Sequence, residues 1–260
     1  MNMDKGRIKR VLENEREILP KLRAKIETTV NKNGDYTGLV ADCFSRIAVC
    51  EYLLFGDSAA FQLNLLEEVK LRMSLFERRD SGEDMGQAVT FVTYKTLLNA
   101  LAAGDRNFTE QFAQRMGESD EYKNAKGKVF NNGPFVLNMG RTLKAFVLND
   151  GPAIARYFPE FSKVMKAWEG GAYLGYAQVL AGILADDLAA AESGFSLLLR
   201  DHVQLCGSGG SLCGTLDEFL SVWGVAMANL CHWRGLKVKA HPPLIPQELI
   251  VMSRNWDGGA

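Results

Sequence analysis

Apolar residues recur every three or four positions along most of the chain, and this period constrains the fold more than any other feature. One such face contains Val40, Phe44 and Ile47, and a later one lies within Leu216–Leu230. Residues at this spacing share one side of a helix, which is the side that packs against the core. Period-two alternation is not convincing anywhere, and the segment Leu236–Val238 is the one candidate for a short strand. The sequence therefore predicts an all-α fold.

Four apolar segments end on a small or polar residue followed by an aspartate, which suggests a weak internal repeat. The four aspartates are Asp57, Asp105, Asp150 and Asp186. Each carboxylate can accept hydrogen bonds from the free N–H groups that open the next helix. This spacing predicts one all-helical domain over residues 1–260, built of stacked antiparallel helices, either helical-repeat-like or a bundle. Residues 236–260 are expected to form an extended, Pro-rich C-terminal tail.

Length and charge limit the classes of function. The chain has 260 residues, of which 47% are hydrophobic, so it can bury a large core. Lys and Arg number 30 and Asp and Glu number 31, giving a net charge of −1. A balanced chain has no overall field that would attract nucleic acid or an anionic membrane. Neither a signal-peptide core nor an apolar stretch of ~20 residues is visible, so we expect a cytoplasmic protein that binds neither nucleic acid nor membrane.

The cysteine count is odd and the chain is not small, so a disulfide framework is not expected. Cys43 and Cys50 lie in an apolar helical pattern and are predicted to be buried as small hydrophobic residues. Five residues could be drawn together as a zinc site: His202, Cys206, Cys213, Cys231 and His232. Only the first two have one-turn spacing, whereas zinc ligands usually come in closely spaced pairs. We therefore predict no metal.

Catalytic interpretations are weak. His202 with Cys206 or Cys213 could form a base and a nucleophile, but Asp201 lies on a different helical face from His202, and no known signature surrounds either cysteine. The Gly-rich stretch 207–214 is followed by Thr215 instead of the lysine of a phosphate-binding loop, so we interpret it as a helix–helix loop. The chain is predicted to have no cofactor and no catalytic residue, and not to be an enzyme.

The candidate binding residues are aromatic and acidic. Trp168, Tyr173 and Tyr176 stand beside glycines at a helix break, where they can form the rim of a partner-binding surface. Packing between closely approaching helices is the alternative role for these rings. Asp120 and Glu121 form an acidic pair that could contact a basic partner, or could simply be solvated. Similar acidic pairs occur at Glu83-Asp84 and Asp186-Asp187.

The C-terminal third carries a series of short motifs. A helical segment with an Asp break at Val179–Asp187 leads to a Leu-rich end at His202, and a second helix ends on Arg234-Gly235. A segment with three prolines then follows at His241–Ile250. This order, over about Gly175 to Val251, resembles a class of bacterial immunity proteins called immunity protein 49. The resemblance implies an all-α protein that is encoded beside a polymorphic toxin and neutralises it.

Three hypotheses follow. The first is an immunity protein that binds a cognate toxin protein and blocks it, which needs no catalytic residue. The second is a helical-repeat scaffold or adaptor that binds a peptide or protein in a groove lined by amide or basic side chains. The third is a helical enzyme that uses Cys206, Cys213 and His202. The many large apolar residues are also compatible with a homodimer.

Overall fold

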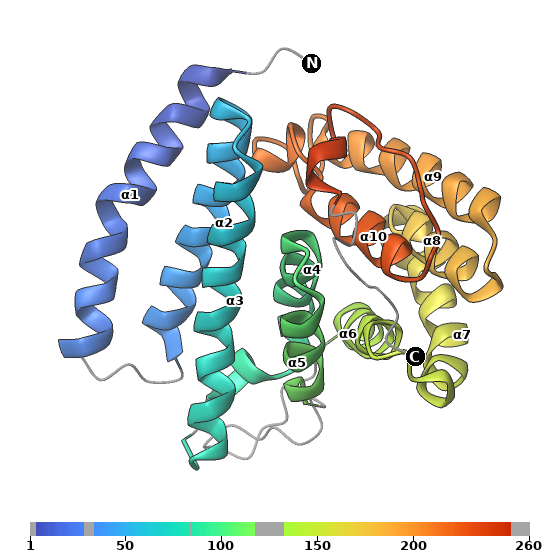
Figure 1. Cartoon of the computed structure of the whole chain (residues 1–260), viewed down its shortest axis with the longest axis horizontal. Coiled ribbons are helices and arrows are strands. Elements are labelled where there is room, and N and C mark those ends of the chain that lie inside the picture. Colours follow the sequence, from blue (N-terminus) through green and yellow to red (C-terminus); the bar gives the residue numbers. More distant parts are fainter. Residues whose placement is uncertain (1–3, 29–33, 84, 118–132, 251–260) are drawn as a thin grey trace, which may run out of the picture.

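The computed structural model describes residues 4–28, 34–83, 85–117 and 133–250, and it confirms the all-α prediction (Figure 1). These residues contain no strand, only an isolated antiparallel bridge between His241 and Ile245. Leu236–Val238 is not a strand, because its backbone bonds to the end of the preceding helix. The N–H of Leu236 donates to Cys231 O at 2.9 Å, and His232 Nε2 lies 3.1 Å from Val238 O.

The elements are named as in Figure 1. The α-helices are α1 (Lys5–Thr28), α2 (Asp35–Phe55), α3 (Ser58–Asp80), α4 (Tyr94–Ala103), α5 (Arg106–Arg115), α6 (Pro134–Val147), α7 (Gly151–Ala167), α8 (Leu174–Ala185), α9 (Leu188–Cys206) and α10 (Val222–Trp233). Short 3₁₀ helices are η2 (Gly86–Val89), η3 (Phe91–Thr93), η5 (Trp168–Gly171), η6 (Leu216–Glu218) and η7 (Gln247–Leu249). No helix in the described ranges is long and apolar enough to cross a bilayer.

The connections of four helix pairs end on the same type of two-residue hinge, which in α6–α7 follows one further residue, Leu148. Its first residue has a left-handed backbone: Gly56, Gly104, Asn149 and Asp186, with φ of 68°, 82°, 55° and 51°. Its second residue is an N-cap whose carboxylate accepts a backbone N–H at 2.8–3.0 Å: Asp57, Asp105, Asp150 and Asp187. The hinges make antiparallel hairpins of α2–α3, α4–α5, α6–α7 and α8–α9, in agreement with the predicted stacking.

The fourth predicted cap was wrong by one residue. Asp186 does not cap α9, because it takes the left-handed position that ends α8, with its N–H bonded to Gly182 O and Ile183 O. Asp187 therefore becomes the N-cap, and its carboxylate accepts the N–H of Ala190 at 3.0 Å. Two consecutive aspartates thus have different backbone roles.

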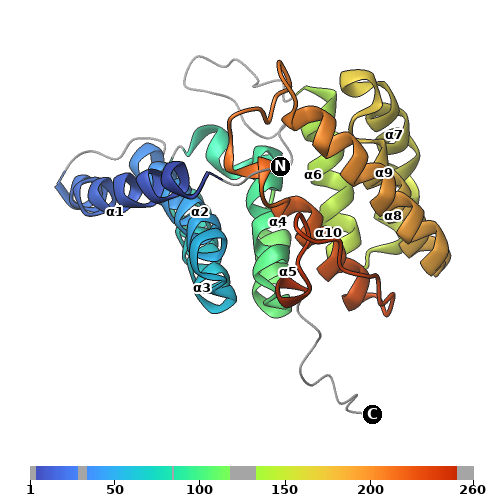
Figure 2. The same ribbon diagram turned by 90° about the horizontal axis from the view of Figure 1, so that it is seen from above.

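The helices form one packed body in which α4 is central. Helices α1 to α3 lie on one side of α4 and α6 to α9 on the other, as Figures 1 and 2 show. Helix α10 returns from the C-terminal part of the chain to pack directly on α4. Asn229 of α10 is fully buried and its amide donates to Leu101 O at 2.9 Å and to Ala102 O at 3.3 Å. This contact fixes the C-terminal region against the middle of the fold.

The C-terminal tail is packed on the core as far as the structure describes it. Ile245 and Leu249 are fully buried, and η7 begins directly after Pro246. The tail also fixes the start of α10, because the N–H of Ser221 donates to Leu244 O at 2.9 Å. Burying two aliphatic side chains contributes roughly 3–6 kcal/mol before chain entropy is counted, which is enough to hold a short segment in place.

Candidate functional site

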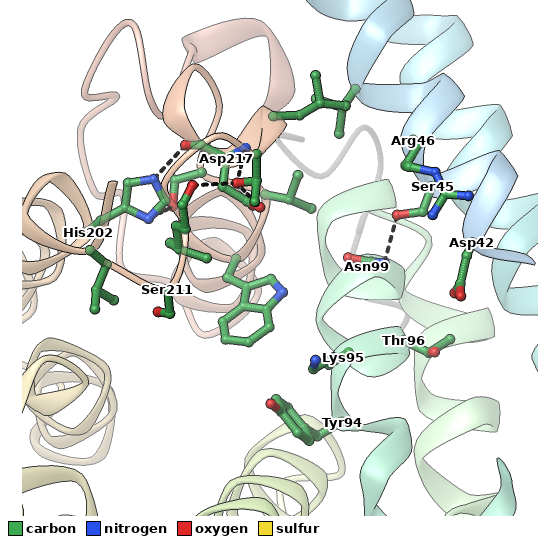
Figure 3. A pocket seen from close by; sticks show the side chains of 18 of the residues that line it. Asp42, Ser45, Arg46, Tyr94, Lys95, Thr96, Asn99, His202, Ser211 and Asp217 are labelled. Carbon is green, nitrogen blue, oxygen red and sulfur yellow. Dashed lines mark hydrogen bonds between the residues drawn. The ribbon is translucent and has the colours of Figure 1, made fainter. Parts of the chain in front are cut away.

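A cavity of about 950 Å³ opens beside α4, between α2–α3 and the loop that joins α9 to α10 (Figure 3). We call it the central cleft. One wall comes from α2, α3 and α4, and the other from α8, α9, η6 and the start of α10. Both walls depend on the return of α10 to α4, because that contact brings residues more than a hundred positions apart to one space.

The first wall of the central cleft is polar and centred on a buried carboxyl group. Glu68 of α3 is only 3% exposed, and its Oε2 accepts a hydrogen bond from Asn99 Nδ2 at 2.7 Å. Asn99 Nδ2 also lies 3.3 Å from Ser45 Oγ, as Figure 3 shows. Burial raises the pKa of Glu68 to about 8, against the opposing effects of the Asn99 bond and the Arg72 charge. The group is therefore mostly protonated at neutral pH.

Two arginines of this wall are held by carboxylates. Arg72 donates to Asp42 Oδ1 at 2.7 Å, and its Nε is buried without a hydrogen-bond partner among the described residues. Arg46 makes a two-pronged contact with Glu15 of α1, at 2.7 and 2.9 Å. These pairs fix the positions of both guanidinium groups, so the wall presents ordered rather than freely moving charge.

The second wall is aromatic. Tyr173, Tyr176 and Trp223 line it, and Tyr94 completes it from the start of α4. Tyr94 lies 5.7 Å from Trp223 and Tyr176 lies 6.3 Å from Trp223, measured between ring centroids, with both pairs edge to face. This geometry is the favourable one for aromatic pairs, so the rings support one another.

A histidine and a serine meet at the back of this wall. His202 Nε2 lies 2.7 Å from Asp217 O, and its Nδ1 lies 3.4 Å from Ser221 Oγ. Because a backbone carbonyl only accepts, Nε2 carries the proton and Nδ1 can accept from the serine. Ser221 is 1% exposed and already caps α10 by accepting the N–H of Gly224 at 3.2 Å. The arrangement positions the loop, and the serine is held as a helix cap.

The hydrogen-bond partners of this histidine among the described residues are Asp217 and Ser221, and neither of them is a cysteine. Cys43, Cys50, Cys206 and Cys231 are buried, as predicted for the first two, and Cys213 is exposed. Burial raises the pKa of the Cys206 thiol to about 11 and that of Cys231 to about 12, so both stay protonated at neutral pH. Groups of three potential metal ligands among His, Cys, Asp and Glu do not occur within the described ranges.

The predicted binding residues have different positions. Tyr173 and Tyr176 lie in the wall of the central cleft. Trp168 is 39% exposed and does not line the cleft, but its ring packs in a tilted arrangement against Phe135, with centroids 5.1 Å apart. Asp120 and Glu121 lie outside the described residues.

Other residues of the central cleft were not singled out by sequence reasoning. Glu68, Asn99 and Trp223 stand within helical faces that read as ordinary packing positions. The Gly-rich loop, interpreted as a simple connection, contributes Ser211, Gly214 and Thr215 to the cleft. A polar residue such as Glu68 inside an apolar stripe was the available signal, because an isolated buried carboxyl group is costly without a partner.

No protein-family model, no curated protein and no solved structure matches this chain. The resemblance to immunity proteins therefore remains a prediction from the motifs of the C-terminal third.

Proposed function

We propose that this chain is an immunity protein that binds a cognate toxin protein and blocks it, and that the central cleft receives a segment of the toxin. The observation that carries the proposal is the cleft itself. It measures about 950 Å³, and an aromatic wall faces a wall of ordered charged groups. Aromatic side chains in a recess dominate the binding energy of many protein interfaces, and fixed charges select the partner.

The chemistry of the central cleft supports binding over thiol catalysis. No cysteine of the described residues lines the cleft, and the buried Cys206 thiol, with a pKa raised to about 11, is protonated at neutral pH and is a much weaker nucleophile than a thiolate. His202 has a neighbour at each ring nitrogen, so it is engaged in holding η6 and α10. The described lining of the cleft therefore provides a recess, aromatic rings and charged side chains for binding, and it contains no thiol paired with a base.

The motifs that carry the family resemblance also contribute to this cleft. His202 ends the first motif and lines the cleft, while the helix that ends on Arg234 supplies Trp223. Arg234 donates to Phe146 O, which anchors the end of α10 on α6. The motif residues thus support the second wall, which is what a family-specific binding site would require.

The experiment is co-expression with the products of adjacent genes, followed by measurement of binding and of cell survival. We expect one neighbouring toxin domain to bind with nanomolar affinity and to lose its toxicity. Glu169 is an exposed residue that lines the cleft, so Glu169→Lys should weaken binding at least about tenfold. Lys70→Glu, an exposed position on α3 outside the cleft, is the matched control and should leave affinity unchanged.

A helical scaffold that binds a peptide is the second candidate. It is favoured by Asn99, Arg46 and Arg72 on the first wall, because amide and basic side chains recognise peptide backbone and acidic groups. A peptide-display screen separates the two. Selection of one short linear motif, with no binding or protection by any adjacent gene product, supports the scaffold and contradicts the immunity function.

A further inference from the structure

One corner of the central cleft is enclosed by a closed ring of five aromatic side chains. The successive centroid distances around the ring are Tyr94–Trp223 5.7 Å, Trp223–Tyr176 6.3 Å, Tyr176–Tyr173 6.0 Å, Tyr173–Phe135 4.8 Å and Phe135–Tyr94 6.1 Å. These residues come from the starts of α4, α6, α8 and α10, so four helices supply one rigid frame. We call the part that faces the cleft the tyrosine pocket, formed by Tyr94, Tyr173, Tyr176 and Trp223.

Two hydroxyl groups of the tyrosine pocket have no protein partner in the described part of the chain. Tyr94 is 4% exposed and Tyr176 is 5% exposed, yet neither hydroxyl makes a hydrogen bond to a described residue. Figure 3 shows the Tyr94 hydroxyl directed into the open space of the cleft. Neither hydroxyl oxygen is among the fully buried polar atoms that lack a partner, so both keep contact with solvent, and a group that enters this corner can hydrogen-bond to them.

Two carboxylates act on tyrosines of the pocket, Glu169 and Asp217 on Tyr173 and Asp217 on Tyr176. Burial raises the pKa of Tyr173, and the carboxylates of Glu169 and Asp217 raise it further. The pKa of Tyr176 is also raised, first by burial and then by neighbours that include Asp217. No basic side chain is among the groups that shift either pKa. These carboxylates favour a cation in the pocket, whereas the Lys95 ammonium, which lines the same cleft, opposes it.

The helix starts around the pocket do not reverse this preference. An exposed helix N-terminus would attract an anion through its free N–H groups. Here the N–H of Tyr94 donates to Phe91 O, that of Tyr176 donates to Tyr173 O at 3.2 Å, and that of Gly224 donates to Ser221 Oγ. These three N–H groups are thus already used, while the ring faces carry the negative part of the aromatic quadrupole.

We propose that the tyrosine pocket binds a positively charged side chain, an ammonium or a guanidinium group, presented by the partner protein. Ring faces and the Asp217 carboxylate balance the charge, and the hydroxyls of Tyr94 and Tyr176 accept its N–H groups. The identity of that partner as a toxin rests on the proposed function, but the preference for a cation does not. Lys95 extends from α4 toward the same space and has no ion pair among the described residues, so it is the like charge that a ligand must displace.

The test is an NMR titration of the full chain with three small probes of similar shape. N-acetyl-arginine amide and N-acetyl-lysine amide carry the charge, and N-acetyl-citrulline amide is the uncharged match for the first. We expect a charged probe to bind at least about tenfold more tightly than the citrulline probe, with shifts at the indole of Trp223. The arginine and lysine arms show which of the two cations the pocket prefers.

Three variants locate the binding in the pocket. The double variant Tyr94→Phe, Tyr176→Phe keeps both rings and should weaken the charged probe about threefold to tenfold. Asp217→Asn should weaken it by a similar factor, and Lys95→Met should strengthen it. Thermal unfolding checks that each variant remains folded. Equal binding of charged and uncharged probes, or no effect of the double variant on the preferred probe, would overturn the proposal.

These measurements need no toxin, so the cation pocket and the immunity function can be contradicted independently of each other. A chain that prefers the charged probe but protects against no neighbouring toxin keeps the cation pocket and loses the immunity function. A chain that neutralises a toxin with unchanged affinity in the double variant, and has no preference for the charged probe, keeps the function and loses the pocket.

Discussion

The α2–α3 and α8–α9 hairpins use the same type of hinge but are held together by opposite means. Between α2 and α3, charged side chains meet, with Arg72 and Asp42 at 2.7 Å and the buried Glu68 directed to Asn99 of α4. Between α8 and α9, glycines allow backbone to touch backbone, since a Cβ on Gly194 would lie 2.5 Å from Val179 N. The difference shows that the hinge sets the direction of the returning helix, whereas the side chains between the two helices determine which chemical groups the hairpin places at the cleft.

That difference separates a functional hairpin from a structural one. The polar packing of α2–α3 leaves Asp42, Glu68 and Arg72 at the central cleft. The glycine packing of α8–α9 has no polar group to offer at Gly182 or Gly194. Its contribution to the cleft comes from the start of α8, through Tyr176, and from the second half of α9, through Leu198, His202 and Leu205. The α8–α9 pair, whose backbones touch, therefore supports the aromatic wall. The α2–α3 pair, which has polar side chains between its helices, supplies the charged groups.

The largest expected effect comes from the buried carboxyl group of Glu68. Its pKa is raised from 4.5 to about 8 in the folded chain, so unfolding releases a proton between these pH values and stability falls as pH rises through them. Glu68→Gln keeps an acceptor for Asn99 but cannot ionise. From pH 5 to pH 9 we expect the wild type to lose roughly 3–5 kcal/mol of unfolding free energy relative to this variant.

Urea unfolding at several pH values measures this difference. Glu67→Gln, at the neighbouring and half-exposed position, is the matched control and should follow the wild type within about 0.5 kcal/mol at every pH. A constant difference between Glu68→Gln and the wild type from pH 5 to pH 9 would show that the carboxyl group is ionised in the folded chain, and would remove the contrast between the two hairpins.

The second effect tests the glycine packing. Gly194→Ala places a methyl group 2.5 Å from Val179 N and 2.9 Å from Gln178 C, so α8 and α9 must move apart. We expect a loss of about 2 kcal/mol in unfolding free energy, because overpacking outweighs the better helix propensity of alanine. Gly151→Ala is the same change at the start of α7, where no atom lies within 4 Å, and it should shift stability by less than about 0.5 kcal/mol. Equal effects at both sites would contradict the close-packing account.

Sequence reasoning predicted what depends on neighbouring residues. The helical period predicted the all-α fold, and three of the four hinge aspartates, Asp57, Asp105 and Asp150, are N-caps as expected. The fourth assignment failed because Asp186-Asp187 offers two equal candidates. Only the geometry at the end of α8 decides which of them takes the left-handed position.

The central cleft could not be predicted in the same way. Tyr94, Phe135 and Trp223 meet in one ring although they stand far apart in the sequence, and each lies within an ordinary apolar helical face. Periodicity indicates that a side chain is buried but not which distant helix covers it. The run containing Tyr173 and Tyr176 was recognised because aromatic residues beside glycines are unusual in a short stretch of sequence. A short sequence pattern thus predicted two residues of a site whose other residues come from distant segments.

The third prediction compares how much the N-caps of the α2–α3 and α8–α9 hinges contribute to the free energy of unfolding. Asp187→Ala removes the acceptor of the Ala190 N–H, and Asp57→Ala removes that of the Ala60 N–H. Each should lower the unfolding free energy by about 1 kcal/mol, since an N-cap contributes that much to a helix whatever packs on it. Denaturant unfolding of both variants checks this. If the loss at one hinge were several times that at the other, the hinge and the packing would not be separable, and the comparison of the hairpins would fail.

The smallest effect converts one hinge into the other. Asp186 holds φ at 51° as a non-glycine residue, where Gly56 holds 68° in the α2–α3 hinge. Asp186→Gly makes the Gly-Asp pair of α2–α3 in α8–α9, and relief of the left-handed strain should raise the unfolding free energy by about 0.5–1 kcal/mol. Asp186→Asn is the control and should change little, because asparagine tolerates this conformation and Asn149 already occupies it in the α6–α7 hinge. A gain in the glycine variant alone would mean that backbone conformation is the whole difference between the hinges. A loss would mean that the Asp186 side chain stabilises α8–α9 in a way that the glycine hinge of α2–α3 does without.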